Sequence, residues 1–319
     1  DLIVIAPATA RVLSAYATGS SADLLTATLL ATRAPVVVCP AMHTEMWEHP
    51  AVQDNLATLR ARGVLVVEPE SGRLAGGDIG HGRLADPATI VATVEAALAP
   101  SDLSGLRIVV TAGGTREPID PVRYLGNRSS GKQGHALARV AARRGADVQL
   151  ITTAASSAPV GVDVVAVETA AEMSAAVAKA APTADVVVMA AAVADFRPVT
   201  VAGQKIKKAA GIPEIRLEPT EDILAGLGAA KPEGQTLVGF AAETTDVAAH
   251  AAEKLARKGA DLLVANDVSQ PDAGFEVDTN RAILLESSGA ITETPLLSKA
   301  ALADLILDRV ATRLGRGVA

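Results

Sequence analysis

The sequence predicts an α/β fold in two domains, each built on a mainly parallel sheet. Short apolar runs recur along the 319 residues, and stretches with helical periodicity separate them, as in strands that alternate with covering helices. The composition agrees, because 49% hydrophobic and 20% charged residues are typical of a chain with buried cores. The runs expected as strands are 2–6, 36–39, 64–67, 107–111, 147–152, 185–190, 237–241 and 262–265.

A domain boundary is expected near residue 100. The alternation stops at Ala99-Pro-Ser-Asp-Leu-Ser-Gly105, and a new strand begins directly after it. This division gives domains of residues 1–100 and 101–319. Asp1 is followed at once by what reads as a buried central strand, so we expect the first domain to be truncated. The predicted fold class is therefore two Rossmann-like domains, of which the first is incomplete.

Further elements of the second domain follow from local patterns. Strands expected at 278–285 and 291–294 are joined by Ser287-Ser-Gly-Ala290, which predicts an added hairpin at the sheet edge. Residues 298–314 have the periodicity of a terminal amphipathic helix. Alanine spacing between 169 and 181 predicts another helix, and a third is expected from about His135.

Composition and charge exclude several classes of protein. Cys39 is the only cysteine, so neither a disulfide framework nor a cysteine-ligated metal cluster is available. The net charge of −7 argues against general nucleic-acid binding, which needs a basic face. The longest nearly apolar stretch, 186–194, is less than half of the roughly 20 residues that a membrane helix needs. We therefore expect a cytoplasmic protein with no nucleic-acid or membrane partner.

A glycine turn follows the first strand of the second domain, and a polar loop leads from it to a helix. Backbone N–H groups in such a turn and at a helix N-terminus favour phosphate. A tight turn that many parallel sheets need is the alternative explanation. The candidate phosphate-binding residues are Gly113, Gly114, Thr115, Ser130, Gly131 and Lys132.

A dinucleotide-binding oxidoreductase is the first alternative for such a fold. It requires Gly-x-Gly-x-x-Gly after the strand and an acidic residue at the end of the second strand. Neither is present, because the second strand ends in Leu150-Ile-Thr-Thr153. The short-chain dehydrogenase pattern Tyr-x-x-x-Lys is also missing, since Arg128 stands four residues after Tyr124. Hydride transfer therefore becomes the minor alternative.

A second group of candidate residues follows strand 185–190. Small residues up to Ala194 allow a flat base to approach the backbone, Asp195 could bind a sugar hydroxyl or a metal, and Phe196 can stack. Lys205-Ile-Lys-Lys208 adds a local cationic segment in an acidic chain, which suits a triphosphate. A solvated surface is the alternative reading of such a run. Lys205 and Lys207 are the candidates there.

Two later strands end in polar residues at the same rim of the predicted sheet. They lie in Val238-Gly-Phe-Ala-Ala-Glu-Thr244 and in Lys258-Gly-Ala-Asp-Leu-Leu-Val-Ala-Asn-Asp-Val-Ser269. Open α/β sheets bind ligands at this rim. Phe240 is a candidate for nucleotide binding and Asn266 for contact with substrate amide or phosphate groups. The alternative to ligand binding is that these polar residues only cap the ends of their strands.

These four motifs, in this order, resemble those of the bacterial phosphopantothenate–cysteine ligases, over residues 106–314. The resemblance implies CTP-dependent amide synthesis in coenzyme A biosynthesis, through an acyl-cytidylate and with Mg²⁺ at the triphosphate. It implies catalytic roles for Asn127 and Lys205, and substrate contacts for Arg123 and Asn127. The choice of CTP over ATP comes from the resemblance alone.

The first domain resembles the later half of the flavin-dependent phosphopantothenoylcysteine decarboxylases. The motifs are Ala6-Pro-Ala-Thr-Ala10, Ser21-Ala-Asp-Leu-Leu25, Pro40-Ala-Met-His-Thr-Glu-Met-Trp47 and the glycine-rich segment 71–83. The resemblance implies FMN beside Thr9, Pro40, Ala41 and Met42. Two positions depart from it: His43 stands where Asn is usual, and Gly76 where the family has a catalytic Cys.

The expected assembly is a homo-oligomer in which the ligase region dimerises. The resemblance and the edge hairpin at 287–290 motivate the dimer. Met42, Met46 and Trp47 are expected to give the first domain an apolar surface that raises the oligomer order, unless they fill a local core. A non-catalytic flavoprotein assembly subunit remains a second alternative.

Overall fold

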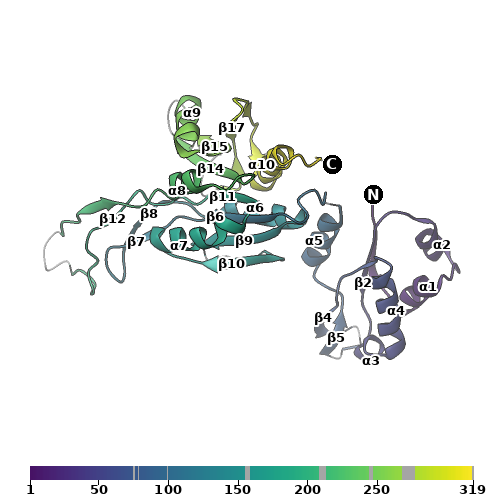
Figure 1. Ribbon diagram of the computed structural model, residues 1–319. Coiled ribbons are helices and arrows are strands. Elements are labelled where there is room, and N and C mark those ends of the chain that lie inside the picture. The colour runs from purple at the N-terminus through teal and green to yellow at the C-terminus, as the bar shows by residue number, and fades with distance from the viewer. Residues whose placement is uncertain are drawn as a thin grey trace. The chain divides into compact units, whose positions relative to one another are not determined.

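The computed structural model describes residues 1–74, 76–77, 79–98, 100–154, 159–207, 213–243, 247–267 and 277–317, without the side chains of 242, 243, 247–252 and 267. The chain divides into two compact units, Asp1–Ala99 and Pro100–Ala319. Figure 1 draws the first in purple to blue and the second in blue-teal to yellow. No helix among the described residues is long and apolar enough to cross a bilayer.

The first unit is a three-stranded parallel sheet with helices on its two faces. Its strands lie in the order β1-β2-β3, and a separate hairpin pairs β4 with β5. The strands are β1 (Ile3–Ala8), β2 (Val36–Pro40), β3 (Leu65–Val66), β4 (Glu70–Arg73) and β5 (Ile79–Arg83). The helices are α1 (Ala10–Thr18), α2 (Leu24–Ala31), α3 (Thr44–Trp47), α4 (Pro50–Ala61) and α5 (Pro87–Leu98).

Alternation along β2 explains how the sheet buries both faces. Val36 and Val38 enter a core with residues of α1 and α4, whereas Val37 and Cys39 enter a smaller core against which α5 packs. Trp47 is buried in the larger core. The expected apolar surface at Met42, Met46 and Trp47 is therefore wrong for Trp47, because the short helix α3 turns the indole inward.

The second unit contains an eight-stranded sheet covered on both faces. Its order is β10-β9-β6-β11-β14-β15-β17-β18. The first six strands are parallel and the last two antiparallel. They are β6 (Arg107–Ala112), β9 (Asp147–Thr152), β10 (Val162–Ala166), β11 (Val186–Met189), β14 (Thr236–Glu243), β15 (Leu262–Asp267), β17 (Ala282–Glu286) and β18 (Ile291–Glu293).

Helices α6 and α10 share a core with one face of this sheet, and α7 and α8 share a core with the other. The bounds are α6 (Lys132–Arg143), α7 (Ala170–Ala180), α8 (Ile223–Ala230), α9 (Val247–Lys258) and α10 (Lys299–Arg313). Three small pairs complete the unit: β7 (Arg116–Pro118) with β8 (Tyr124–Gly126), β12 (Phe196–Pro198) with β13 (Leu217–Pro219), and β16 (Thr279–Asn280) with β19 (Leu297–Ser298).

The α/β class with mainly parallel sheets and most of the expected elements are confirmed. Every expected strand is present except that the run 278–285 is broken at Arg281 into β16 and β17, which pair in different sheets. The hairpin β17–β18 is added at the sheet edge, and the terminal helix covers 299–313. The start expected at His135 was wrong, because Gly131, in the left-handed conformation, ends the loop and α6 begins at Lys132. Strand β10 was missed because it is a half-buried edge strand without strong apolar alternation.

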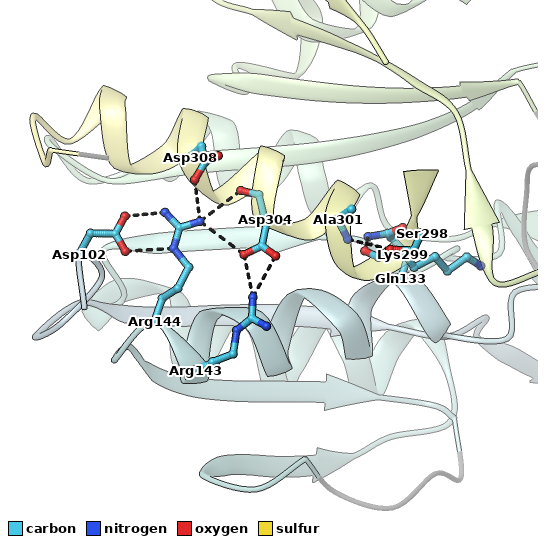
Figure 2. Close-up of polar contacts among 9 residues, drawn as sticks. All are labelled: Asp102, Gln133, Arg143, Arg144, Ser298, Lys299, Ala301, Asp304 and Asp308. Carbon is cyan, nitrogen blue, oxygen red and sulfur yellow. Dashed lines mark hydrogen bonds and ion pairs between the residues drawn. The ribbon is translucent and has the colours of Figure 1, made fainter. Parts of the chain in front are cut away.

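A buried ionic cluster joins α6 to α10. The Arg144 side chain is 1% exposed and donates to Asp102 at 2.5 and 3.0 Å and to Asp308 at 2.8 Å. The guanidinium also reaches the carbonyl of Asp304, and the neighbouring Arg143 pairs with the Asp304 carboxylate (Figure 2). Burial of a charge is tolerated only when such partners are present. The cluster therefore fixes α10 against the end of α6.

Replacement of Arg144 should destabilise the second unit strongly. In Arg144→Ala, the buried Asp102 carboxylate loses its guanidinium, and we expect the free energy of unfolding to fall by about 3–5 kcal/mol. Arg143→Ala is the matched control, because Arg143 is more exposed and has one carboxylate partner; we expect a loss of about 1 kcal/mol or less. Urea denaturation of the full chain measures both, and equal losses would contradict the assigned role of Arg144.

Candidate functional site

A cavity of about 750 Å³ lies in the second unit, at the carboxyl end of the parallel strands. Chain order reverses between β6 and β11, because β9 and β10 lie on one side of this pair and β14 and β15 on the other. Ligands of open α/β sheets bind at such a point. The cavity is lined by most of the segment 127–134, which follows the small pair β7–β8 after β6, and by 189–195 at and after the end of β11.

The loop after β11 is fixed by the glycine turn after β6. The Ala192 N–H donates to the Gly113 carbonyl at 2.8 Å, and the Thr115 N–H donates back to the Ala192 carbonyl at 3.3 Å. The Thr115 hydroxyl accepts from the Ala194 N–H at 2.9 Å. Gly113, Gly114 and Thr115 are buried and do not line the cavity. Their hydrogen bonds position the loop after β11, which forms part of the cavity wall.

Two glycines in this region stand where a side chain would not fit. Gly113 has a φ of +87°, and Gly131 has a φ of +78°. A Cβ on Gly131 would lie 3.2 Å from the Gly113 nitrogen. A Cβ on Gly114 would lie 2.7 Å from the Asn127 carbonyl oxygen. The turn, the Asn127 loop and the start of α6 therefore pack backbone against backbone.

Asn127 bridges the two walls of the cavity. Its side-chain Nδ2 donates to the carbonyl oxygens of Ala192 and Val193, at 3.2 and 3.1 Å. The amide thus holds the loop after β11 in place and also lines the cavity. Ser130 lies beside this segment, half-buried and outside the lining residues.

Charged side chains of both signs line the cavity. Lys258 is buried and pairs with Asp222, and Lys254 lies one turn earlier on α9. Burial and the nearby Lys132 lower the pKa of Lys299 to about 8. Sequence reasoning missed Lys254, Lys258 and Lys299. The spacing of Lys254 and Lys258 on one helix face after β14 was a sequence signal that could have identified them. No sequence pattern pointed to Lys299.

Carboxylates suitable for a metal are present in the cavity. Asp195 and Glu221 both line it. Mg²⁺ is usually held by one or two carboxylates together with substrate phosphates, so a preformed cage is not required. Among the residues that the structure describes, no group of three or more His, Cys, Asp or Glu side chains could hold a metal ion.

The far wall of the cavity is mainly apolar. Phe240 of β14 lines it together with Ile223 and Leu224 at the start of α8. Asn266, near the end of β15, also lines the cavity, and its buried Oδ1 has no hydrogen-bond partner among the described residues. A buried acceptor without a partner is costly, so a ligand donor at this position would satisfy it.

The pairs β7–β8 and β12–β13 form an arm that extends from the sheet, at the left in Figure 1. Asp120 is its polar centre: it accepts from Arg123 Nε at 3.0 Å and from the Ile206 N–H at 3.1 Å. The hydrogen bonds from Arg123 hold the pKa of Asp120 well below its usual range. Arg123 also donates to the Ile206 carbonyl at 2.8 Å. Sequence reasoning gave Asp120 no role.

Several predicted residues lie on the arm and not in the cavity. Lys205 and Lys207 flank Ile206 with exposed side chains, and neither has an ion pair among the described residues. Lys208 lies outside the described residues. Phe196 begins β12 and is half exposed. The cavity thus brings together seven of the predicted residues: Asn127, Gly131, Lys132, Ala194, Asp195, Phe240 and Asn266.

In the first unit, the predicted flavin residues lie together at the carboxyl ends of β1 and β2. Thr9 caps α1, and the Ala41 N–H donates to the Ala8 carbonyl at 3.2 Å. The Met42 N–H donates to the Gly82 carbonyl on β5 at 2.9 Å, so the hairpin β4–β5 is attached to the Pro40–Met42 segment. His43 is the N-cap of α3 without a side-chain hydrogen bond to it.

The packing of the glycine turn gives a testable expectation. In Gly114→Ala, the new methyl group must displace the Asn127 carbonyl, and we expect the free energy of unfolding to fall by about 1–3 kcal/mol. Gly226→Ala on α8 is the control, because nothing lies within 4 Å of its Cβ; a gain of up to about 1 kcal/mol is expected there. Urea denaturation compares the two, and equal stability would disprove the close contact.

Two family descriptions match the chain in order. The Flavoprotein family matches residues 1–99, and the family described as DNA/pantothenate metabolism flavoprotein C-terminal domain matches residues 103–314. The second match alone covers more than half of the chain. Each match falls within one of the two compact units.

Similar proteins agree over nearly the whole chain. The coenzyme A biosynthesis bifunctional protein CoaBC of Mycobacterium tuberculosis is 54% identical, over 98% of this chain and 79% of that protein. The protein of the same name in Escherichia coli is 46% identical, over 98% and 78%. A crystal structure of the C-terminal domain of a CoaBC protein has a TM-score of 0.58 at 42% identity, covering 67% of this chain and 98% of that one. The chain therefore belongs to the family of coenzyme A biosynthesis bifunctional proteins.

Proposed function

We propose that the second unit ligates 4′-phosphopantothenate to L-cysteine with CTP, and that the first unit is part of an FMN-dependent decarboxylase acting on the product. One observation carries the ligase proposal. The cavity lies at the reversal point of the parallel sheet, has the volume of a ligand site, and combines lysines with a loop of small residues. The choice of cytosine rests on the resemblance to the family.

The reaction needs activation of a carboxylate. The phosphopantothenate carboxylate oxygen attacks the α-phosphorus of CTP and forms an acyl-cytidylate, and pyrophosphate leaves. The cysteine amine then attacks the acyl carbon, the C–O bond to phosphate breaks, and CMP leaves. No covalent protein nucleophile is needed, so positioning and charge stabilisation supply the rate. The lysines of the cavity suit the triphosphate and the departing pyrophosphate.

The walls of the cavity suggest how the nucleotide lies. The backbone beside Ala194 and the ring of Phe240 would contact the base, and Asp195 would meet a ribose hydroxyl or Mg²⁺. Asp195 or Glu221 would hold Mg²⁺, which would neutralise part of the triphosphate charge. The resemblance assigns Asn127 to the acyl-cytidylate, and Asn127 lines the cavity beside the loop at Ala192. Asn266 would donate or accept at the substrate amide.

The glycine turn supports this site indirectly. Gly113, Gly114 and Thr115 keep the loop after β11 in place, and Gly131 and Lys132 begin α6 at the cavity. Phosphate would therefore meet the start of α6, with Ser130 next to it, where helix N–H groups favour anions. The glycine turn itself would affect the site only indirectly, by holding the loop after β11 in place.

The arm would supply further cations to the reaction. Asp120 and Arg123 hold the backbone of Ile206 from both sides, which presents Lys205 and Lys207 as exposed neighbours. We assign Lys205 to charge stabilisation at the α-phosphate, with Lys207 as an additional triphosphate contact. Arg123 has donors left for substrate phosphate beyond those used by Asp120.

Pyrophosphate release tests the function directly. The full chain should release pyrophosphate with CTP and phosphopantothenate, and the addition of cysteine should give CMP and the amide. ATP and UTP are tested in place of CTP for comparison. Release that needs a nicotinamide cofactor, or no release with any nucleotide, would contradict the proposal.

Lys205→Ala should slow pyrophosphate release by about 10²–10³ because a charge directed at the reacting phosphates is lost. Lys207→Ala should have a smaller effect. Lys179→Ala is the matched control, because Lys179 is exposed on α7 and does not line the cavity. If Lys205→Ala released pyrophosphate as fast as the control, Lys205 would have no role in the reaction.

The first unit has the arrangement expected at a flavin site, because Thr9, Pro40, Ala41 and Met42 lie at the ends of parallel strands. These residues would hold FMN, which supplies redox chemistry when bound. Gly76 offers no thiol at the position where the resemblance implies a catalytic Cys. Any proton donor for decarboxylation must therefore come from another residue.

We further propose that the arm joins two copies of the chain. Seven large apolar side chains are 42–60% exposed on it, which is an unusual density for a surface open to water. The late hairpin, the surface expected from the sequence, exposes only Ile291 to this extent. The apolar residues of the arm are Val122, Tyr124, Phe196, Val199, Val201, Ile215 and Leu217.

Light scattering on the full chain tests this dimer. Val199→Glu places a charge on the apolar face of the arm, and we expect the number of subunits to fall to roughly half. Ile291→Glu is the control, because it places the same charge on the late hairpin and should leave the assembly intact. If only Ile291→Glu gave a smaller assembly, the interface would lie on the late hairpin and not on the arm.

A further inference from the structure

Thr220 lies where the arm meets the cavity. It follows the arm strand β13, precedes α8 and lines the cavity. Its hydroxyl donates to the Ala194 carbonyl, and its N–H donates to the Asp195 carbonyl at 3.0 Å. One residue therefore holds two successive carbonyl groups of the loop after β11.

These two hydrogen bonds continue the strand pairing of the arm. In the pair β12–β13, Phe196 lies opposite Pro219, so Asp195 and Thr220 form the next step of the ladder towards the cavity. Figure 1 shows β12 leading away from the large sheet into the arm. The loop after β11 therefore cannot move relative to the arm without breaking the hydrogen bonds of Thr220.

The segment that contains Thr220 is anchored on three helices. The Glu221 carboxylate accepts from the Ser174 hydroxyl of α7 at 2.7 Å. The Asp222 carboxylate caps the N-terminus of α8 and pairs with Lys258 of α9. Thr220 therefore holds the loop from a fixed support.

A second threonine holds Ala194 from the other side. The Thr115 hydroxyl belongs to a fully buried side chain and accepts from the Ala194 N–H at 2.9 Å. The N–H and the carbonyl of Ala194 are thus both paired with threonine hydroxyls, one beside the glycine turn and one at the end of the arm. The orientation of the two peptide groups that flank Ala194 is therefore set by these two side chains.

We propose that Thr220 is a positioning residue for the nucleotide, and that it acts through the backbone of Ala194 and Asp195. The proposal rests on the proposed function, because it assumes that the base lies beside Ala194 and that Asp195 meets the ribose or Mg²⁺. The hydroxyl orders these two residues before the nucleotide enters, so less ordering is needed on binding. The affinity for the nucleotide therefore depends on the hydroxyl and not on the size of the side chain.

Three variants test the hydroxyl at nearly constant shape. In Thr220→Val, the Ala194 carbonyl loses its donor and can turn towards water in the cavity, so we expect the affinity for CTP to fall about tenfold. Thr220→Ser keeps the donor and should bind CTP nearly as tightly as the wild type. Thr312→Val is the matched control, because Thr312 is exposed on α10, does not line the cavity and donates its hydroxyl to the Asp308 carbonyl.

Two measurements on the full chain separate positioning from a general structural effect. Calorimetric titration with Mg²⁺ and CTP, without phosphopantothenate, gives the affinity for the nucleotide. Pyrophosphate release at saturating CTP gives the KM for phosphopantothenate, which Thr220→Val should leave unchanged. A loss of packing throughout the cavity would instead weaken the binding of both substrates.

The outcomes distinguish the two proposals. If the wild-type chain does not bind CTP, the proposed function fails and the role of Thr220 fails with it. If the wild type binds CTP but Thr220→Val binds it equally well, or Thr220→Ser binds it as weakly as Thr220→Val, only the role of Thr220 is overturned. A matching rise in the KM for phosphopantothenate also overturns it. If Thr220→Val does not fold, as judged by circular dichroism, Thr220→Ala takes its place in the comparison with Thr220→Ser.

Discussion

The buried guanidinium of Arg144 is the constraint on which the site depends. It links the end of α6 to Asp102, at the beginning of the second unit, and to Asp304 and Asp308 on α10. Because a buried charge requires all its partners, α10 cannot shift along α6 without leaving a carboxylate or the guanidinium unpaired. The first turns of both helices reach the cavity, so this cluster contributes to how the two helices meet there, together with the hydrogen bond from Gln133 to the Lys299 carbonyl.

The cavity combines a rigid wall with charges that do not favour folding. Its wall is rigid because backbone packs on backbone around the glycine turn, and Thr115 holds the loop that follows β11. Burial and the nearby Lys132 disfavour the charge of Lys299, which also lines the cavity. The arm also contains groups whose placement does not favour folding, because its apolar side chains remain exposed to water.

Local patterns were sufficient to predict the layers of the fold. Runs of valine and isoleucine buried on both faces identify parallel strands, and the alternating helices follow from their periodicity. The motif order gave the family and seven of the residues that line the cavity, from Asn127 to Asn266. These features are determined by residues close in the sequence, because a strand and the loop that follows it form one continuous signal. The weakest signals were the short pairs, such as β7 with β8, whose strands have only three residues each.

The functions of individual side chains were decided by contacts across long sequence separations. The sequence by itself determined two α/β units, the strands and the loops at their carboxyl ends. Only the tertiary structure decided that Gly113 acts from behind the wall, that Asp120 holds the lysine segment of the arm, and that Trp47 is buried. Lys299 had no motif, and its burial at the cavity arises because α6, the segment before β16 and α10 meet there. The physical reason is that burial and charge depend on neighbours in space, whereas a sequence pattern reports only neighbours along the chain.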